Sequence, residues 1–400
     1  MIYFTIIIVI VLILSYCYAP FPRWRTYWLL WKNVLFNYAE NIPAKTRLRQ
    51  ALLLVRYVVL CPLYTCLWYL DEVLYPSYKK QVINPVFIIG SPRSGTTFLH
   101  RTLASDEETF FALRHIEWRF PFIIVQKFIK FFHLEQRIAK MNYWPKSEAG
   151  VKAAKMHANT LYDWEEDGVF FEERFLHHFY ILLRFPYRGL KDLDNFTLLP
   201  EKDQCRMMGA HRRAIQKVMY VRARNKIYLS KEGAGHTKLR LITEMYPHVK
   251  FIVNIRPSFE YVSSILELIR LSTLVKTNAD ILQMDGFKEM YIKRMSDDSA
   301  HLLNFLNDKY NYQIVLVAFN QLVNNVKDAV GSIYKQLKLP ITKTYEDYLL
   351  DLQGKQKSRE KNYEYSQEQF AGFEIFDNLV TKVKACGGVC VLQEIRLDKL

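Results

Sequence analysis

The stretch VFIIGSPRSGTTFLH, residues 86–100, decides the fold that the sequence predicts. Its first five residues form an apolar run typical of a buried strand, and a helix is expected to begin near Thr96. Gly90 and Gly95 enclose four residues, as the glycines do in the phosphate-binding loop G-x-x-x-x-G-K-[ST]. In such loops, backbone N–H groups and a helix N-terminus hold an anion. The stretch therefore predicts a strand, an anion-binding loop and a helix.

The side chains of this loop differ from those of common nucleotide-binding loops. Thr96 stands where the lysine is expected, and the cation, Arg93, lies within the loop. An arginine contacts two oxyanion atoms at once, whereas the usual lysine acts as a point charge beside a metal ion. The loop is thus suited to a terminal phosphate or sulfate without obligatory magnesium. A simple tight turn, with Arg93 in a surface ion pair, is the alternative.

A second strand, helix and strand pattern follows further along the chain. KIYLS at 226–230 and VKFIVNI at 249–255 are expected strands, with a helix between them. Arg256 directly follows the last strand, and Ser264 lies eight residues later in the next expected helix. Because α/β sheets bind ligands beyond the carboxyl ends of their strands, Arg256 is a candidate ligand-binding residue. The alternation predicts one α/β domain over residues 78–400, a three-layer, P-loop-like fold with a central parallel sheet.

The N-terminus is strongly apolar. No charged side chain occurs in residues 1–22, and IYFTIIIVIVLILSYCYA has about the length that a helix needs to cross a bilayer. A cleaved signal peptide would begin with basic residues, and this start contains none. The sequence therefore predicts a transmembrane anchor at 1–22.

A second apolar stretch, ALLLVRYVVLCPLYTCLWYL at 51–70, includes Arg56 and Pro62. It is a second span, a membrane-surface helix or a helix packed on the protein, and the last two are favoured. Residues 23–77 form a basic juxtamembrane segment in this interpretation. The basic side chains before the stretch place residues 23–50 in the cytosol by the positive-inside rule. The side on which the rest of the chain lies then depends on whether 51–70 spans.

Charge and cysteine content limit the classes of partner. The formal net charge of +15 favours anionic partners such as nucleotides, acidic glycans or anionic lipids. Nucleic acid is not expected, because the sequence has no zinc-knuckle spacing, no aromatic RNA-binding signature and no basic arm. The six cysteines make no Cys-x-x-Cys pair, so no metal site is expected. A bridge between Cys386 and Cys390 is left open.

The sequence resembles sulfotransferases that use 3′-phosphoadenosine 5′-phosphosulfate (PAPS). PVFIIGSPRSGTTFLHRTLAS, at 85–105, is similar to the phosphosulfate loop of a branch with Pro-Arg-Ser-Gly-Thr-Thr, which includes bacterial and tyrosylprotein enzymes. Arg256 and Ser264, in NIRPSFEYVSSILEL, match the family's second element, and the resemblance extends over residues 85 to about 370. It implies PAPS as co-substrate, the 3′-phosphate on Arg256 and Ser264, and no metal. The residues implied to hold the 5′-phosphosulfate are Arg93, Ser94, Gly95, Thr96 and Thr97.

The resemblance also implies a catalytic base that acts on the acceptor. Glu117, in FALRHIEWRFP, is the nearest counterpart of the family's glutamate, and its apolar neighbours would desolvate it. An ion pair with Arg114 or Arg119 is the alternative interpretation of Glu117. His115 and His157 are rival bases, because other sulfotransferases use histidine.

Lys231 resembles the family lysine that stabilises the departing phosphate oxygen. The segment Lys231-Glu232-Gly233 departs from the Lys-Ser-Pro or Lys-Asp-Pro that family members often carry. An acidic triplet at 165–167 matches another family feature, and a solvated helix start is its alternative interpretation.

These inferences predict a membrane-anchored sulfotransferase that moves a sulfuryl group from PAPS to a hydroxyl or amine. A lipid, a sterol or a glycan is the expected acceptor, and a peptide tyrosine is the runner-up. The aromatic, basic stretch 114–137 is expected to line the acceptor side. The expected location is a membrane of the endomembrane, Golgi type, and a homodimer is left open.

Two other functions compete with this interpretation. A P-loop kinase or NTPase would use ATP and magnesium, but Thr96 replaces the lysine that it needs. A catalytically silent, membrane-anchored protein would use its basic surface to bind lipids or acidic glycans. Such a protein is disfavoured because all members of the expected nucleotide site are present, namely Arg93, Thr96, Thr97, Arg256 and Ser264.

Overall fold

The computed structural model describes residues 2–17, 24–193, 195–223, 225–232, 236–308, 312–357 and 370–395. The chain divides into two compact units, and each is built from segments that are far apart in the sequence. Unit 1 comprises residues 1–82, 113–225 and 269–287, and unit 2 comprises residues 83–112, 226–268 and 288–400.

Unit 2 is built on a sheet with the strand order β2-β3-β1-β4-β5-β6. Neighbouring strands from β2 to β5 pair in parallel, and β6 pairs antiparallel with β5. The central strands are rich in Val and Ile and are buried along their length, as parallel strands covered by helices are. The strands are β1 (Pro85–Gly90), β2 (Phe110–Phe111), β3 (Ile227–Glu232), β4 (Lys250–Ile255), β5 (Gln313–Ala318) and β6 (Val389–Val391).

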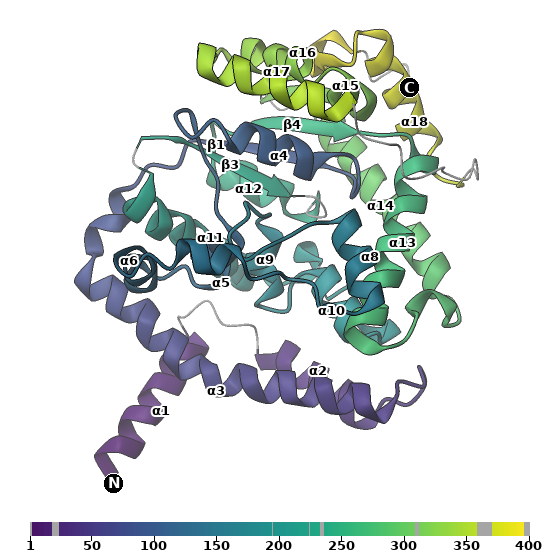
Figure 1. Cartoon of the computed structure of the whole chain (residues 1–400). Coiled ribbons are helices and arrows are strands. Elements are labelled where there is room, and N and C mark those ends of the chain that lie inside the picture. The colour runs from purple at the N-terminus through teal and green to yellow at the C-terminus, as the bar shows by residue number, and fades with distance from the viewer. Residues whose placement is uncertain are drawn as a thin grey trace. The chain divides into compact units, whose positions relative to one another are not determined.

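Helices pack against this sheet, as Figure 1 shows for α4 beside β1 and β3. In α16, buried apolar residues recur every three or four positions, which gives the helix one apolar face toward β5 and β6. The predicted α/β class with a mostly parallel sheet is confirmed, and β6 makes the sheet mixed. The helices are α4 (Thr96–Ala104), α12 (Leu239–Met245), α15 (Phe319–Asn324), α16 (Val326–Leu337), α17 (Lys343–Lys357) and α18 (Glu374–Ala385), with most of α13 (Ser258–Thr277) and α14 (Phe287–Asn307).

The chain order reverses at β1, which lies between β3 and β4. Open α/β sheets bind ligands at such a point, beyond the carboxyl ends of the strands. β1 ends at Gly90, which is level with Asn254 of β4, and Ile89 is level with Glu232 of β3. The loop after β1, the end of β3 and Arg256 after β4 therefore meet at one edge of the sheet.

Unit 1 is helical and is organised around two long helices, α3 (Ala44–Leu74) and α11 (Glu201–Arg222). Both α6 and the short helix η1 (Pro76–Lys80) pack on α11, and α2 packs on α3. The other helices of the unit are α1 (Ile2–Cys17), α2 (Trp24–Phe36), α5 (His115–Arg119), α6 (Ile123–Phe131), α7 (Glu135–Ala139), α8 (Glu148–Met156), α9 (Gly168–Glu172) and α10 (His178–Arg184).

The two apolar stretches near the N-terminus form separate helices. The helix in the predicted anchor, α1, has 16 residues, and residues 18–23 lie outside the described part of the chain. The second stretch lies within α3, which has 31 residues and is long and apolar enough to cross a membrane by length and composition. Both α1 and α2 contact α3, and Figure 1 shows the N-terminal part of α1 extending away from it. Farther along the chain, Cys386 and Cys390 are free thiols.

A buried ion pair attaches the end of α3 to unit 1. The Lys217 ammonium on α11 lies 3.3 Å from the Asp71 carboxylate and 3.8 Å from the centroid of the Trp68 ring. The carboxylate of Asp71 also accepts the backbone N–H groups of Ile123 and Ile124, at 2.8 and 3.1 Å. Burial lowers the pKa of Lys217 to about 8, although Asp71 acts in the opposite direction. Asp71 therefore supports both a buried cation and the first turn of α6.

Replacing Asp71 with alanine is expected to destabilise the protein by about 3–5 kcal/mol, because it leaves a buried cation without its partner. Urea unfolding of the full chain in detergent measures the change. The control is Asp297→Ala on α14, which breaks an exposed pair with Lys293 and is expected to cost at most about 1 kcal/mol. Equal effects of the two substitutions would contradict the role given to Asp71.

Candidate functional site

The loop after β1 has a backbone that few residues can adopt. Gly90 packs so closely on β4 that a Cβ would lie 2.3 Å from the carbonyl oxygen of Asn254. Gly95, at the N-terminus of α4, has φ 88°, in the left-handed region that glycine tolerates. Arg93 also has a positive φ, 67°, which is uncommon for a residue with a side chain and occurs where the surroundings impose it. Packing and backbone conformation together fix the shape of the loop.

The two arginines that the sequence assigned to the ligand lie together. Arg93 donates from Nε to Ser264 Oγ at 3.0 Å, and Arg256 donates from Nη1 to the carbonyl oxygen of Arg93 at 2.8 Å. Arg256 also pairs with Glu260 at 2.9 Å, and its guanidinium lies 4.0 Å from the centroid of the Phe319 ring. Only 4% of Arg256 is exposed. Arg93, Arg256 and Ser264 therefore form one connected group in unit 2.

Lys231 joins this group through α4. It lies within β3, level with Ile88 of β1, because β3 extends two residues beyond the predicted strand. Its Nζ donates to Thr97 Oγ1 at 2.8 Å, in the first turn of α4. The positively charged ammonium thus lies beside the helix N-terminus, which carries a partial positive charge. Together the two favour an anion at this place. Residues 233–235, which complete the unusual Lys-Glu-Gly segment, lie outside the described part of the chain.

Buried polar atoms near the loop lack hydrogen-bond partners among the described residues. They include Ser94 Oγ in the loop and Asn254 Oδ1 in β4, which is level with Gly90. Because buried polar groups are nearly always satisfied, such atoms indicate a site for a ligand or water. The Ser94 hydroxyl can donate to an anion that has several acceptor oxygens. The described residues contain no group of three or more His, Cys, Asp or Glu that could hold a metal ion.

Glu117 lies in unit 1, in the short helix α5, and both of its carboxylate oxygens are engaged. Oε1 accepts from Arg222 Nε at 2.8 Å, and Oε2 accepts from Arg222 Nη2 at 3.0 Å. Oε2 also accepts the backbone N–H of Arg114 at 2.7 Å, which caps α5. The alternative interpretation named Arg114 or Arg119 as the ion-pair partner of Glu117, but the partner is Arg222 of α11, and Arg119 pairs with Glu173 instead. A proton taken up by Glu117 would break this bidentate contact.

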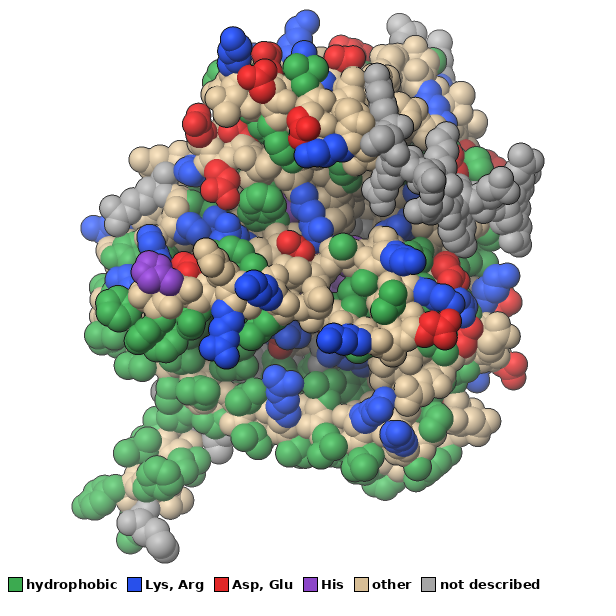
Figure 2. All heavy atoms as spheres, in the orientation of Figure 1, with side chains coloured by type: hydrophobic (Ala, Val, Ile, Leu, Met, Phe, Trp, Pro, Cys, Tyr) green, Lys and Arg blue, Asp and Glu red, His purple; other side chains and the backbone are tan. Residues whose placement is uncertain are grey.

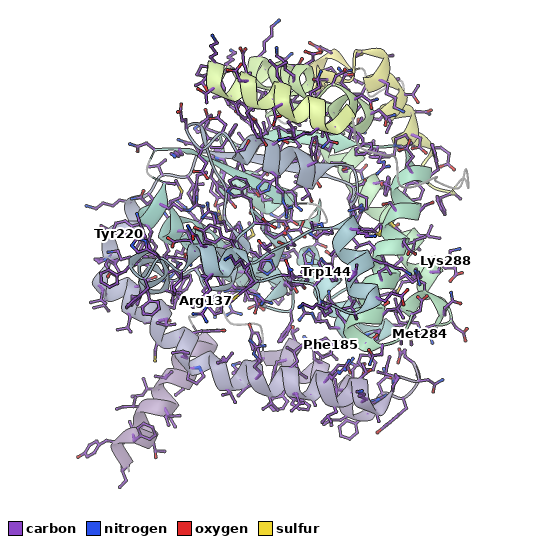
Figure 3. The ribbon with its side chains drawn as sticks, in the orientation of Figure 1. Arg137, Trp144, Phe185, Tyr220, Met284 and Lys288 are labelled. Carbon is purple, nitrogen blue, oxygen red and sulfur yellow. The ribbon has the colours of Figure 1, made fainter. Side chains whose placement is uncertain are left out.

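His115 belongs to a second buried cluster in unit 1. Asn159 Nδ2 lies 3.2 Å from His115 Nδ1 and 2.6 Å from Glu165 Oε2. Because the Asn159 amide donates to both groups, the hydrogen of the neutral imidazole is placed on Nε2. His157 Nε2 lies 3.7 Å from Glu165 Oε2, and Trp144, labelled in Figure 3, donates to the carbonyl oxygen of His157 at 2.7 Å. His157 therefore lies beside the Glu165 carboxylate, and His115 is connected to the same carboxylate through Asn159.

Two atoms of this cluster lack protein partners. His115 Nε2 and Asn159 Oδ1 are buried and form no hydrogen bond with any described residue. His115 Nε2 is a donor because it carries the hydrogen of the neutral imidazole, and Asn159 Oδ1 is an acceptor. A hydroxyl group can both accept and donate a hydrogen bond, so the cluster has the polar groups that a hydroxyl-bearing ligand requires.

Burial lowers the pKa of His115 below its usual 6.5, although Glu165 acts in the opposite direction. The unfolded chain therefore binds this proton at higher pH than the folded chain. The free energy of unfolding is expected to fall as the pH drops from about 6.5 through the folded pKa. Urea titrations near pH 7.5 and pH 5.5 test this, and His115→Gln is expected to reduce the loss. An unchanged pH dependence in this variant would contradict the expectation.

Sequence reasoning did not single out several members of the two clusters. Asn254 had a detectable signal, because it is a polar residue in an otherwise apolar strand. Asn159 lies in a segment that resembles the family, but no local pattern assigns it a partner. Arg222 and Phe319 had no signal, since they reach their partners from segments far away in the sequence.

Comparisons with known proteins agree with this geometry. The chain is similar in fold to sulfotransferase STF9 from Mycobacterium avium, with a TM-score of 0.64, 14% sequence identity and coverage of 89% of this chain and 88% of that chain. It is also similar to sulfotransferase STF1 from Mycobacterium tuberculosis, with a TM-score of 0.59, 17% identity and coverage of 89% and 91%. At these identities the likeness concerns the fold. No curated protein sequence matches the chain significantly.

The protein has an α/β fold with a mostly parallel sheet, a glycine loop at the switch point of the sheet and a buried arginine beside that loop. This combination is typical of α/β proteins that bind an anionic ligand at the edge of the sheet. The chain belongs to the sulfotransferase family, whose model matches residues 85–343. Family and fold together identify a sulfotransferase enzyme.

Proposed function

We propose that the protein is a membrane-anchored sulfotransferase that uses PAPS as its donor. The observation that carries the proposal is the connected group of Arg93, Arg256 and Ser264 beside the loop after β1. The loop also contains one buried hydroxyl, Ser94 Oγ, that has no hydrogen-bond partner among the described residues. These donors suit a nucleotide with phosphate or phosphosulfate groups at both its 3′ and 5′ positions.

The donor groups divide between the two ends of this nucleotide. Arg256 and Ser264 hold the 3′-phosphate, and the loop from Arg93 to Thr97 holds the 5′-phosphosulfate through its backbone N–H groups and hydroxyls. Lys231, which contacts Thr97, is placed at the oxygen that links phosphorus to sulfur. No metal ion takes part in this proposal, because the arginines and the helix N-terminus supply the positive charge.

In the transfer step, an acceptor oxygen or nitrogen attacks sulfur while the bond from sulfur to the bridging oxygen breaks. The electron pair of that bond stays on adenosine 3′,5′-bisphosphate, where Lys231 stabilises the new negative charge. Glu117 takes the acceptor proton after it separates from Arg222. His115 carries its hydrogen on Nε2, so it donates to the acceptor oxygen and orients it.

A lipid, sterol or glycan presented at a membrane is the proposed acceptor class. Unit 1 contains the buried donor and acceptor pair, His115 Nε2 and Asn159 Oδ1, that suits a hydroxyl. The same unit contains α1 and α3, two strongly apolar helices. An endomembrane location and an anchor within residues 1–22 complete the proposal.

Calorimetry on the full chain in detergent tests the donor site. Adenosine 3′,5′-bisphosphate and ATP with magnesium are titrated in turn, the first in the presence of a chelator. We expect metal-independent binding of the bisphosphate. Binding of ATP with magnesium alone would overturn the proposal in favour of a kinase or NTPase. Binding of neither nucleotide by a folded protein would overturn it in favour of a catalytically silent membrane protein.

A further inference from the structure

Exposed apolar side chains are unevenly distributed between the two units. All but three of the large apolar side chains exposed in the described part of the chain belong to unit 1. Scattered exposed apolar residues are ordinary, but a concentration of them marks a surface for an apolar partner. Figure 2 shows apolar side chains gathered along α3 and α1. The three exceptions in unit 2 are Tyr348, Leu350 and Ile375.

One face of α3 is fixed to unit 1 from end to end. Thr46 donates to the carbonyl oxygen of Thr277, and Gln50 donates to that of Arg184, each at 2.6 Å. Near the other end, Asp71 meets the Lys217 ammonium. The buried residues recur mostly every three, four or seven positions, which places them on one side of the helix. They are Thr46, Gln50, Leu54, Cys61, Thr65, Trp68 and Asp71.

The opposite face of α3 is apolar and exposed along the same length. Its residues also recur every three or four positions, at roughly half a turn of the helix from the buried face. Three exposed basic residues, Lys45, Arg49 and Arg56, follow one edge of this stripe. The stripe consists of Leu48, Leu52, Val55, Val59, Leu63, Cys66, Leu70 and Val73.

Two neighbouring helices show the same combination of exposed apolar and basic side chains. On α2, Trp28 and Phe36 are exposed together with Lys32. On α6, the exposed side chains are Phe128, Phe131, Lys127 and Lys130, and α6 begins where Asp71 of α3 caps it. Aromatic and basic side chains of this kind favour the region between lipid headgroups and acyl chains.

We propose that α3 lies in the plane of the membrane surface, with its exposed stripe in the bilayer and its other face against unit 1. The proposal rests on the proposed membrane function and specifies how the enzyme meets the lipid. A spanning α3 would draw the Lys217 ammonium, which contacts Asp71 on its buried face, into the hydrocarbon at high cost. The basic edge of the stripe pairs with anionic headgroups. The chain from Trp24 onward therefore stays on one side of the membrane.

Native cysteines provide matched probes for this proposal. Cys66 lies in the stripe, whereas Cys205 on α11 and Cys386 in unit 2 are exposed elsewhere. Three full-length variants each keep one of these thiols and carry serine at the other two and at Cys17. A fourth carries Val59→Cys, in the middle of α3, with serine at all four positions. Each is labelled with a fluorophore and inserted into vesicles of phosphatidylcholine and phosphatidylserine whose acyl chains are brominated at a shallow or a deep position.

Shallow bromine atoms are expected to quench the labels at positions 59 and 66 to a similar extent, and deep ones much less, because a surface helix sinks only about 5–10 Å. The labels on Cys205 and Cys386 should not be quenched. Stronger quenching of position 59 by deep bromine atoms would show a spanning helix and overturn the proposal. No quenching at 59 and 66 would also overturn it, because the stripe would then face water or protein. Bisphosphate binding by the same variants reports the donor site separately, so the two proposals can fail independently.

Discussion

Replacing Arg256 with alanine is expected to weaken the binding of adenosine 3′,5′-bisphosphate about 100-fold, or by about 3 kcal/mol. The substitution removes the charge-assisted hydrogen bond that is proposed between Arg256 and the 3′-phosphate. It also removes the donor that holds the carbonyl oxygen of Arg93, so the phosphosulfate loop loses a support. Arg256→Lys keeps the charge but not the planar fork, and an intermediate loss is expected. Calorimetry on the full chain measures both affinities.

The matched control is Arg240→Ala on α12, whose side chain is exposed and pairs with Glu244. Its bisphosphate affinity should stay within about twofold of the native value, because surface pairs contribute little. Ser264→Ala removes the hydroxyl that contacts Arg93 and gives an independent test of the same phosphate site. Thermal unfolding of each variant shows whether the fold is intact. Native affinity in a folded Arg256→Ala protein would refute the assignment of the 3′-phosphate site.

Replacing Lys231 with alanine is expected to lower kcat about 100- to 1,000-fold while bisphosphate affinity changes much less. The ammonium is proposed to stabilise charge that develops on the bridging oxygen in the transition state, and losing one such donor has an effect of this size. Initial rates with radiolabelled PAPS and a membrane lipid extract as acceptor give kcat. Calorimetry gives the affinity of the same protein for the bisphosphate.

Lys226→Ala is the control, because Lys226 precedes the same strand and contacts the carbonyl oxygen of Glu107 instead of α4. Its kcat should match that of the native protein. Thr97→Val removes the hydroxyl that accepts from Lys231 and should give a smaller loss of kcat. A loss of bisphosphate binding as large as the loss of kcat in Lys231→Ala would assign Lys231 to ground-state binding and contradict a role specific to the transition state.

The loop after β1 and the group beside it could be predicted from the sequence because their signals are local. An apolar strand, two glycines and a helix start within fifteen residues define the loop, and its backbone angles follow from that pattern. Arg256 follows a strand directly, so the rule that ligands bind at strand ends places it at the same edge as the loop. Because the strands are parallel, their carboxyl ends lie at the same edge of the sheet, and the residues that follow them come close together.

The contacts of unit 1 could not be predicted in the same way. Glu117 meets Arg222, which lies 105 residues later, and no pattern near either residue announces the pair. The two faces of α3 are also hidden in the sequence, because apolar residues occupy both of them. Only the segments packed on one face show which apolar residues are buried. The sequence alone therefore leaves 51–70 open between a span, a surface helix and a packed helix.

The interleaved course of the chain has a consequence for its biosynthesis. Thr46 of α3 donates to Thr277, and residues 269–287 complete unit 1. The ribosome makes α1, α2 and α3 long before it makes those residues. Closing so long a loop is slow, and unpaired apolar helices are prone to aggregate during the delay. Early contact with a bilayer would cover the apolar faces of these helices, so a membrane is expected to reduce aggregation while the protein is being synthesised and folded.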